Sequence, residues 1–202
     1  MPATKIMVMR HANKPGGRRS SPRGVTAMGE KDKYSLDVRG WLRAGALVTF
    51  FSPLNARLAA LGLALPGTIF ASDDHKHPAP DGEGAKQGSH SKRPVETVTP
   101  LAAKLLGRKP DTSHWKGGEA ALVAAAMACD GAVLICWQHE AIPKIADLII
   151  PRPNAIPQAW PEDRYDVFWV FDPPAAPGQP WRFSQVPQNL LAGDLDEPIG
   201  AG

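Results

Sequence analysis

Apolar and polar positions follow one another along this chain in blocks that predict strands and helices in turn. The run Lys5–Arg10 is apolar between its two charged ends, which is typical of a strand covered on both faces in a parallel sheet. Runs of the same kind at Gly67–Ser72 and Ala132–Trp137 predict two more such strands. Later runs at Asp166–Phe171 and Trp181–Val186 predict strands separated by a turn rich in proline and glycine.

Apolar residues at helical spacing occupy the intervals between these strands. Asp37 is suited to cap a helix over Val38–Phe51. A second helix is expected over Arg93–Leu106, with Gly107 just after its end, and further helices are expected before and after the strand Ala132–Trp137. This alternation predicts an α/β fold, a three-layer sandwich in which a mostly parallel central sheet lies between helices on both faces.

Length and turn residues indicate one domain with long loops. At 202 residues the chain has the size of a single domain, so residues 1–202 are expected to form one unit. Its 21 prolines and 19 glycines leave the apolar segments well patterned, which indicates long ordered loops between them. Residues 11–36 form a basic loop, residues from about 73 to 91 form a polar insertion, and a loosely packed tail is expected from about residue 188.

Charge and cysteine content narrow the range of functions. Residues 1–43 contain ten Lys or Arg against three Asp or Glu, so this part should attract an anion. No nucleic-acid-binding motif accompanies these cations, so a phosphorylated small molecule or another anionic substrate is expected, and no nucleic acid. Cys129 and Cys136 are too few for a disulfide framework. Since no signal peptide and no apolar run of membrane-spanning length is found, we expect a cytoplasmic protein without membrane contact.

Polar side chains stand at the ends of three predicted strands. Arg10 and His11 end the first strand, Ser72 ends the second, and His139 with Glu140 follows the strand that ends at Trp137. Ligands of doubly wound sheets bind beyond the carboxyl ends of the strands. If the three strands are parallel neighbours, these side chains meet at one edge of the sheet.

These segments, taken in order, resemble the motifs of the histidine phosphatase superfamily, the group that includes phosphoglycerate mutases and histidine acid phosphatases. RHANKP is similar to the Arg-His-Gly signature of the family, and LDVRGWLRA is similar to its Leu-Thr-x-x-Gly-x-x-Arg-Ala segment. FAS and the later KRPVETVTPLA resemble its Ser…Arg-x-x-x-Thr segment with an insertion between them, and LICWQHEAI resembles its second-histidine motif. The resemblance spans most of the chain and implies a phosphoglycerate mutase-like fold.

The resemblance also implies roles for particular residues. His11 would be the nucleophile that accepts the phosphoryl group, and Glu140 would be the acid that protonates the leaving group. The phosphate oxygens would be held by Arg10, Lys14, Arg93 and His139. The chain departs from the family pattern at Ala12, where glycine is usual, and at Asp37, where threonine is usual.

Phosphoryl transfer calls for these residue types on chemical grounds as well. Negative charge spreads over three oxygens during transfer, and guanidinium groups suit those oxygens. A neutral imidazole is a competent nucleophile near pH 7, and a carboxyl group can supply and retrieve one proton. No metal and no cofactor is required. Metal-ligand types do occur in the polar insertion, but without a recognised spacing they are expected to face solvent; they are Asp73, Asp74, His75, His77 and His90.

Simpler roles exist for the same residues. His11 could cap a strand end, His139 could be a core histidine, and Glu140 could do no more than stabilise a helix dipole. In that last case Glu30 and Asp32 are the alternative proton donors. We expect a metal-independent phosphatase that hydrolyses a phosphomonoester through a phosphohistidine. The alternatives are a phosphoglycerate-mutase-type phosphotransferase and a non-catalytic member that binds a phosphorylated ligand or a protein.

Overall fold

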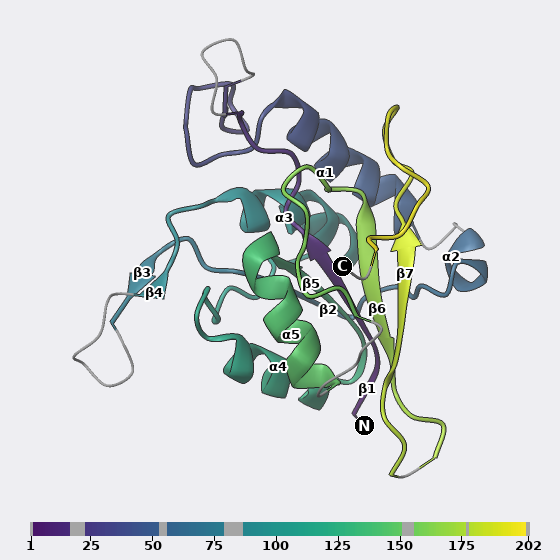
Figure 1. Cartoon of the computed structure of the whole chain (residues 1–202). Helices are drawn as coiled ribbons and strands as arrows, with labels where there is room; N and C mark the ends of the chain where they lie inside the picture. The colour runs from purple at the N-terminus through teal and green to yellow at the C-terminus, as the bar shows by residue number, and fades with distance from the viewer. Residues whose placement is uncertain are drawn as a thin grey trace.

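A five-stranded mixed sheet forms the centre of the molecule (Figure 1). The computed structural model describes residues 2–16, 23–52, 56–78, 87–150, 156–176 and 178–200. In order across the sheet the strands are β2 (Thr68–Ala71), β5 (Gly131–Trp137), β1 (Ala3–Arg10), β6 (Val167–Asp172) and β7 (Arg182–Pro187). All five strands that the sequence predicts are therefore present.

Strand direction changes between the two halves of the sheet. β2, β5 and β1 pair in parallel, whereas β6 pairs antiparallel with both β1 and β7. The connection between β6 and β7, residues 173–181, is too short for a parallel crossover, which takes a dozen or more residues. The prediction of an α/β fold is confirmed, and the sheet is mixed, with its parallel strands at one side.

Helices and one small hairpin fill the connections between strands. The helices are α1 (Val38–Phe50), α2 (Arg57–Ala60), α3 (Arg93–Leu106), α4 (Glu119–Ala128), the 3-10 turn His139–Ala141 and α5 (Ile142–Ile149). The hairpin is formed by β3 (Lys76–His77) and β4 (Gln87–Gly88), and it projects from the main sheet at the left of Figure 1. It lies in the predicted polar insertion, of which residues 79–86 are outside the described part.

Both faces of the sheet carry apolar packing. Ile6 and Val8 of β1 belong to a cluster that includes buried residues of α4 and α5. Met7 and Met9, which alternate with them, belong to a second cluster with buried residues of α1 and α3. Successive side chains of a strand point to opposite faces, so a continuous apolar run is what a strand buried on both faces requires.

The helix ends follow the signals in the sequence. The Asp37 side chain accepts a hydrogen bond from the Gly40 N–H at 2.7 Å and caps α1. Gly107 ends α3 in the left-handed region at a φ of 64°, where a side chain would be strained. Pro100 lies inside α3 without ending it.

The segment after Pro187, expected to be loose, is packed against the domain. Arg43 of α1 is fully buried, and both Asp194 carboxylate oxygens accept hydrogen bonds from its guanidinium group, at 2.6 and 2.9 Å. Gln188 and Ile199 are also buried. A buried arginine needs a counter-ion, since an unpaired charge in the interior costs several kcal/mol. The tail is held because it supplies that counter-ion, a long-range pairing that local composition does not reveal.

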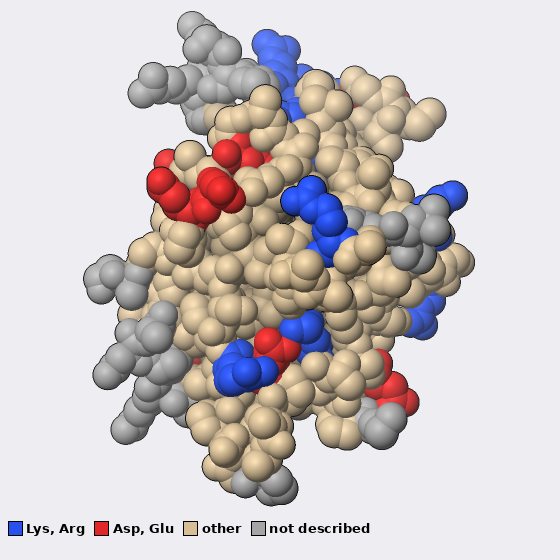
Figure 2. All heavy atoms as spheres, turned by 90° about the vertical axis from the view of Figure 1, so that its right-hand side faces the viewer, with Lys and Arg blue, Asp and Glu red and all other residues tan. Residues whose placement is uncertain are grey.

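The surface offers separate small groups of charge on the side that carries β7 (Figure 2). Uncharged residues cover most of this face; one acidic group, at the upper left, lies apart from the basic residues, whereas another, in the lower centre, lies between basic residues. Within the described ranges, no helix has the length and apolar character needed to cross a membrane. Cys129 and Cys136 are both free thiols, and Cys136 is buried in β5.

Candidate active site

The parallel pairing of β1 with β5 brings the two predicted histidine motifs to one edge of the sheet. Arg10 lies opposite Trp137 in the register, so His11 and His139 follow neighbouring strand ends. The His11 N–H donates to the Trp137 carbonyl at 3.0 Å and continues the ladder by one residue. On the other side of β5, the buried Ser72 hydroxyl accepts a hydrogen bond from the Gln138 amide at 3.0 Å.

His11 is buried and held in one tautomer. Its side chain is only 3% exposed, and Nδ1 lies 2.8 Å from the Ala12 carbonyl oxygen. A carbonyl only accepts, so Nδ1 carries the hydrogen and the lone pair of the neutral ring lies on Nε2. Burial lowers the pKa of His11 to about 3, and the nearby charges of Arg10 and Arg93 act in the same direction. The ring is therefore neutral at pH 7, as a nucleophile must be.

Arg10 is committed largely to the backbone of a neighbouring loop. It is fully buried, and its Nη1 donates to three carbonyl oxygens, of Pro161 at 3.1 Å, Glu162 at 2.6 Å and Arg164 at 3.0 Å. Its Nε is buried and has no hydrogen-bond partner among the described residues. The sequence analysis predicts that Arg10 holds phosphate oxygens. The structure adds a second role, in which Arg10 holds the loop before β6 against the site.

Arg93 starts α3 and also ties a loop in place. Its Nη2 donates to the Lys33 carbonyl at 2.7 Å and its Nε to the Ser35 carbonyl at 3.2 Å, while Nη1 has only a long contact of 3.5 Å with the Ser91 hydroxyl. Burial lowers the pKa of Arg93. Its guanidinium group still acts on His11 electrostatically, so a bound anion would meet this charge as well.

Thr97 is a site residue that the sequence analysis did not single out. Its hydroxyl accepts the Ala12 N–H at 2.8 Å and donates to the Arg93 carbonyl at 2.7 Å. The side chain is completely buried. It therefore joins the turn after β1 to the first turn of α3 and fixes His11 relative to Arg93. The signal was present in the Arg-x-x-x-Thr spacing that carried the family resemblance.

The second histidine motif has a different environment. The His139 side chain is 15% exposed, and its Nδ1 lies 2.9 Å from a Glu140 carboxylate oxygen without the angle of a hydrogen bond. Glu140 is about half exposed and also forms an ion pair with Lys116. The contact with His139, followed by that with Lys116, holds the pKa of Glu140 far below its usual range. Glu140 is thus an anion at neutral pH, which does not favour it as the proton donor of the unliganded site.

Two further predicted positions lie close to this centre. Lys14 is half-buried three residues after His11. Asp32, an alternative proton donor, accepts a hydrogen bond from the Lys92 amino group at 2.7 Å, and that contact lowers its pKa. Like Glu140, Asp32 is therefore disfavoured as a proton donor.

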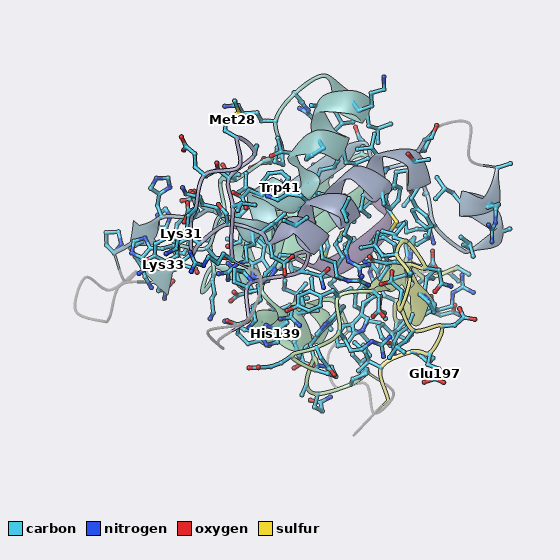
Figure 3. All side chains as sticks on the ribbon, turned by 90° about the horizontal axis from the view of Figure 1, so that it is seen from above. Met28, Lys31, Lys33, Trp41, His139 and Glu197 are labelled. Carbon is cyan, nitrogen blue, oxygen red and sulfur yellow. The ribbon has the colours of Figure 1, made fainter. Side chains whose placement is uncertain are left out.

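The insertion packs against the segment that carries Trp115 and Lys116, the latter being the partner of Glu140. The His77 ring stacks on Trp115 with 3.9 Å between ring centroids, and the Gly88 N–H donates to the Lys116 carbonyl at 2.7 Å. Seen from above the strand ends, His139 lies between the loop that carries Lys31 and Lys33 and the segment that carries Glu197 (Figure 3).

Metal-ligand types do come together at the start of the insertion. One ligand atom from each of Asp73, Asp74 and His75 lies within 4.8 Å of the others, while His77 contacts the Asp73 carboxylate at 2.7 Å. The sequence analysis expected these residues to face solvent. The His75 side chain does so, at 78% exposed, whereas those of Asp73, Asp74 and His77 are only 15%, 29% and 27% exposed. The grouping follows from three consecutive residues on one turn, so adjacency in sequence accounts for it.

Two cavities, of about 410 and 400 Å³, lie away from the strand ends. The first lies at the amino end of β2, with Arg108 and Lys109 among its lining residues. The second lies between α1 and α3, where Val48 and Leu101 contribute to the lining. None of the predicted site residues lines either cavity.

Comparison with known proteins adds no assignment. No protein-family model matches this chain, and no curated protein matches it either. A functional proposal therefore has to rest on the geometry at the ends of β1 and β5.

Proposed function

We propose that this protein is a metal-independent phosphatase that hydrolyses a phosphomonoester through a phosphohistidine on His11. The proposal includes a phosphoglycerate mutase-like, three-layer arrangement of the domain. One observation carries it: His11 is buried, neutral and fixed by the Ala12 carbonyl so that Nε2 presents its lone pair. A histidine that only capped a strand end would not need this tautomer, nor the charges of Arg10 and Arg93 around it.

The reaction would proceed in two displacements. Nε2 of His11 attacks phosphorus and forms the N–P bond while the bond from phosphorus to the ester oxygen breaks. Arg93 and His139 offset the charge on the phosphoryl oxygens, together with the N–H groups of Arg10 that the backbone leaves unused. Water then attacks the phosphohistidine, which releases inorganic phosphate and restores the neutral imidazole.

The departing oxygen needs a proton in the first displacement. Glu140 is the candidate from the sequence, but it is ionised and paired with Lys116 before substrate binds. A phosphate dianion close to Glu140 would raise its pKa, and a substrate that binds as the monoanion would bring a proton with it. We therefore propose Glu140 as the partner of His139, and the proton that reaches the departing oxygen as the one that the substrate monoanion brings.

A non-catalytic, phosphate-binding protein is the second candidate. The observation that favours it is that both arginines already donate to backbone carbonyls, Arg10 to three of them and Arg93 to two. Such a protein would bind inorganic phosphate and turn nothing over. The proposed phosphatase, in contrast, must form a covalent intermediate on His11.

The two candidates separate in one experiment. The protein is incubated with p-nitrophenyl phosphate and with phosphorylated metabolites in EDTA, between pH 4 and pH 8, and phosphate release is measured. Acid-labile, base-stable radioactive phosphate on the protein, present in the wild type and lost in His11→Asn, is the result expected of a phosphohistidine. Phosphate binding without any turnover would favour the non-catalytic, phosphate-binding protein. Turnover that EDTA abolishes would contradict the metal-independent mechanism.

A further inference from the structure

Tyr165 lies against the proposed nucleophile, on the loop that Arg10 holds. Its hydroxyl is 3.3 Å from Arg10 Nη2, and the Arg10 guanidinium carbon lies 3.9 Å from the centre of its ring. Its ring centroid is 6.3 Å from that of His11. Tyr165 directly precedes Asp166, the residue before β6, so it lies at the edge of the sheet where β1 ends.

The hydrogen bonds of this hydroxyl leave its proton unused. A phenol oxygen can accept two hydrogen bonds and donate one. The Arg10 Nη2 group beside the Tyr165 oxygen is a donor, so the oxygen accepts from it. Across the described ranges of the chain no group accepts the hydroxyl hydrogen. A half-buried hydroxyl beside the arginines and a neutral histidine therefore keeps a hydrogen-bond donor free for an anion held at the site.

We propose that Tyr165 donates this hydrogen bond to an oxygen of the phosphoryl group held at His11, so that it is a ligand-binding residue of the site. The proposal rests on the proposed function, since it places the anion at His11. Burial raises the pKa of Tyr165, which keeps the phenol protonated and able to donate at neutral pH. A hydroxyl without charge suits this position, because the site already contains the charges of Arg10 and Arg93.

The same arrangement accounts for the hydrogen bonds of Arg10. Its Nη1 binds the carbonyls of Pro161, Glu162 and Arg164, which fixes the backbone immediately before Tyr165, and its Nη2 orients the hydroxyl. The arginine of the first motif thus delivers a second donor to the phosphate as well as its own charge. A purely structural tyrosine would need only the stacking of its ring on the guanidinium group.

The test separates the hydroxyl from the ring. Tyr165→Phe keeps the stacking on Arg10 and removes only the oxygen, and Tyr34→Phe is a matched control, because Tyr34 is the other tyrosine of the chain. Inorganic phosphate and tungstate are the probes. We expect Tyr165→Phe to weaken binding of both anions about 10- to 100-fold, the range for a hydrogen bond to a charged group, and Tyr34→Phe to leave it unchanged. Unchanged anion binding in Tyr165→Phe would overturn the proposal.

A spectroscopic measurement makes the result independent of turnover. In Tyr34→Phe labelled with [¹³C]tyrosine, Tyr165 gives the single phenol carbon resonance. Addition of inorganic phosphate should shift this resonance and raise the pKa read from its titration, because an anion that accepts from the hydroxyl disfavours phenolate. The shift would support the inference even in a protein that shows no phosphatase activity. A resonance that phosphate leaves in place, in a protein that binds phosphate by calorimetry, would overturn it.

Discussion

The two histidines at the ends of β1 and β5 are neighbours in the sheet but not in their surroundings. His11 is buried, its Nδ1–H donates to a carbonyl, and cations lie around it. His139 is partly exposed and lies beside the Glu140 carboxylate, which Lys116 also contacts. Cations and burial keep the His11 ring neutral. In the proposed mechanism the His11 ring would attack phosphorus and the His139 ring would contact a phosphoryl oxygen.

The largest expected effect comes from the first histidine. His11→Asn should lower phosphate release by at least about 10³-fold, because the bond-forming nitrogen is gone. Asparagine can still donate an N–H to the Ala12 carbonyl, so the turn should keep its conformation. Steady-state turnover, with circular dichroism as the check on folding, measures this. Turnover within tenfold of the wild type would remove His11 as the nucleophile.

The second histidine should matter less. His139→Asn removes one stabilising contact to the transferring oxygens, for which a loss of about 10²-fold in kcat is expected. Phosphohistidine should still form on His11, more slowly, and rapid-quench labelling would detect it. If this variant formed no intermediate while His11→Asn did, the assignment of nucleophile and oxygen ligand would have to be reversed.

The third prediction concerns stability against pH. The pKa of His11 is about 3 in the folded protein and about 6.5 when unfolded, so below pH 6.5 the unfolded chain takes up a proton that the native state refuses. Stability is therefore lost as pH falls. Between pH 7 and pH 5 the wild type should lose about 2 kcal/mol more than His11→Asn. Urea unfolding at both pH values measures this, and equal losses in the two proteins would contradict the buried, neutral His11.

The smallest effect is expected at Glu140. Because this residue is already ionised and paired with Lys116, Glu140→Gln should lower turnover less than about tenfold and alike for alkyl and nitrophenyl phosphates. A general acid would behave differently, with a loss of about 10²–10⁴ confined to the alkyl phosphates and a burst of nitrophenolate with the aryl ester. Turnover of alkyl and nitrophenyl phosphates, measured for Glu140→Gln and for Lys116→Met as a matched variant, distinguishes an ion-pair partner from a general acid.

The sequence predicts the parallel side of this molecule better than the antiparallel side. Apolar runs locate β1 and β5, and the rule that ligands bind at carboxyl ends then places His11 and His139 together. That rule does not find Tyr165, because Tyr165 precedes a strand. It lies near the end of β1 only because β6 runs antiparallel to β1. No local sequence pattern predicts that β6 runs antiparallel to β1.

Side-chain roles were harder to predict than positions. Arg10 lies at the strand end where the sequence places it. Its contacts with the backbone before β6 could not be predicted, because Pro161 follows Arg10 by 151 residues in the chain. The burial of Asp194 against Arg43 has the same origin. Periodicity reports which residues are buried, whereas long-range partners of buried polar groups emerge only when the chain is folded.

The central place of β1 also sets an order of events during synthesis. β1 is made before the other four strands of the sheet, yet its partners β5 and β6 begin only at Gly131 and Val167. The nascent chain must therefore carry an unpaired, strongly apolar segment while most of the domain is still being made, a state that favours aggregation and chaperone capture. A chain cut short before Trp137 would contain His11 but lack the second histidine motif that β5 places beside it.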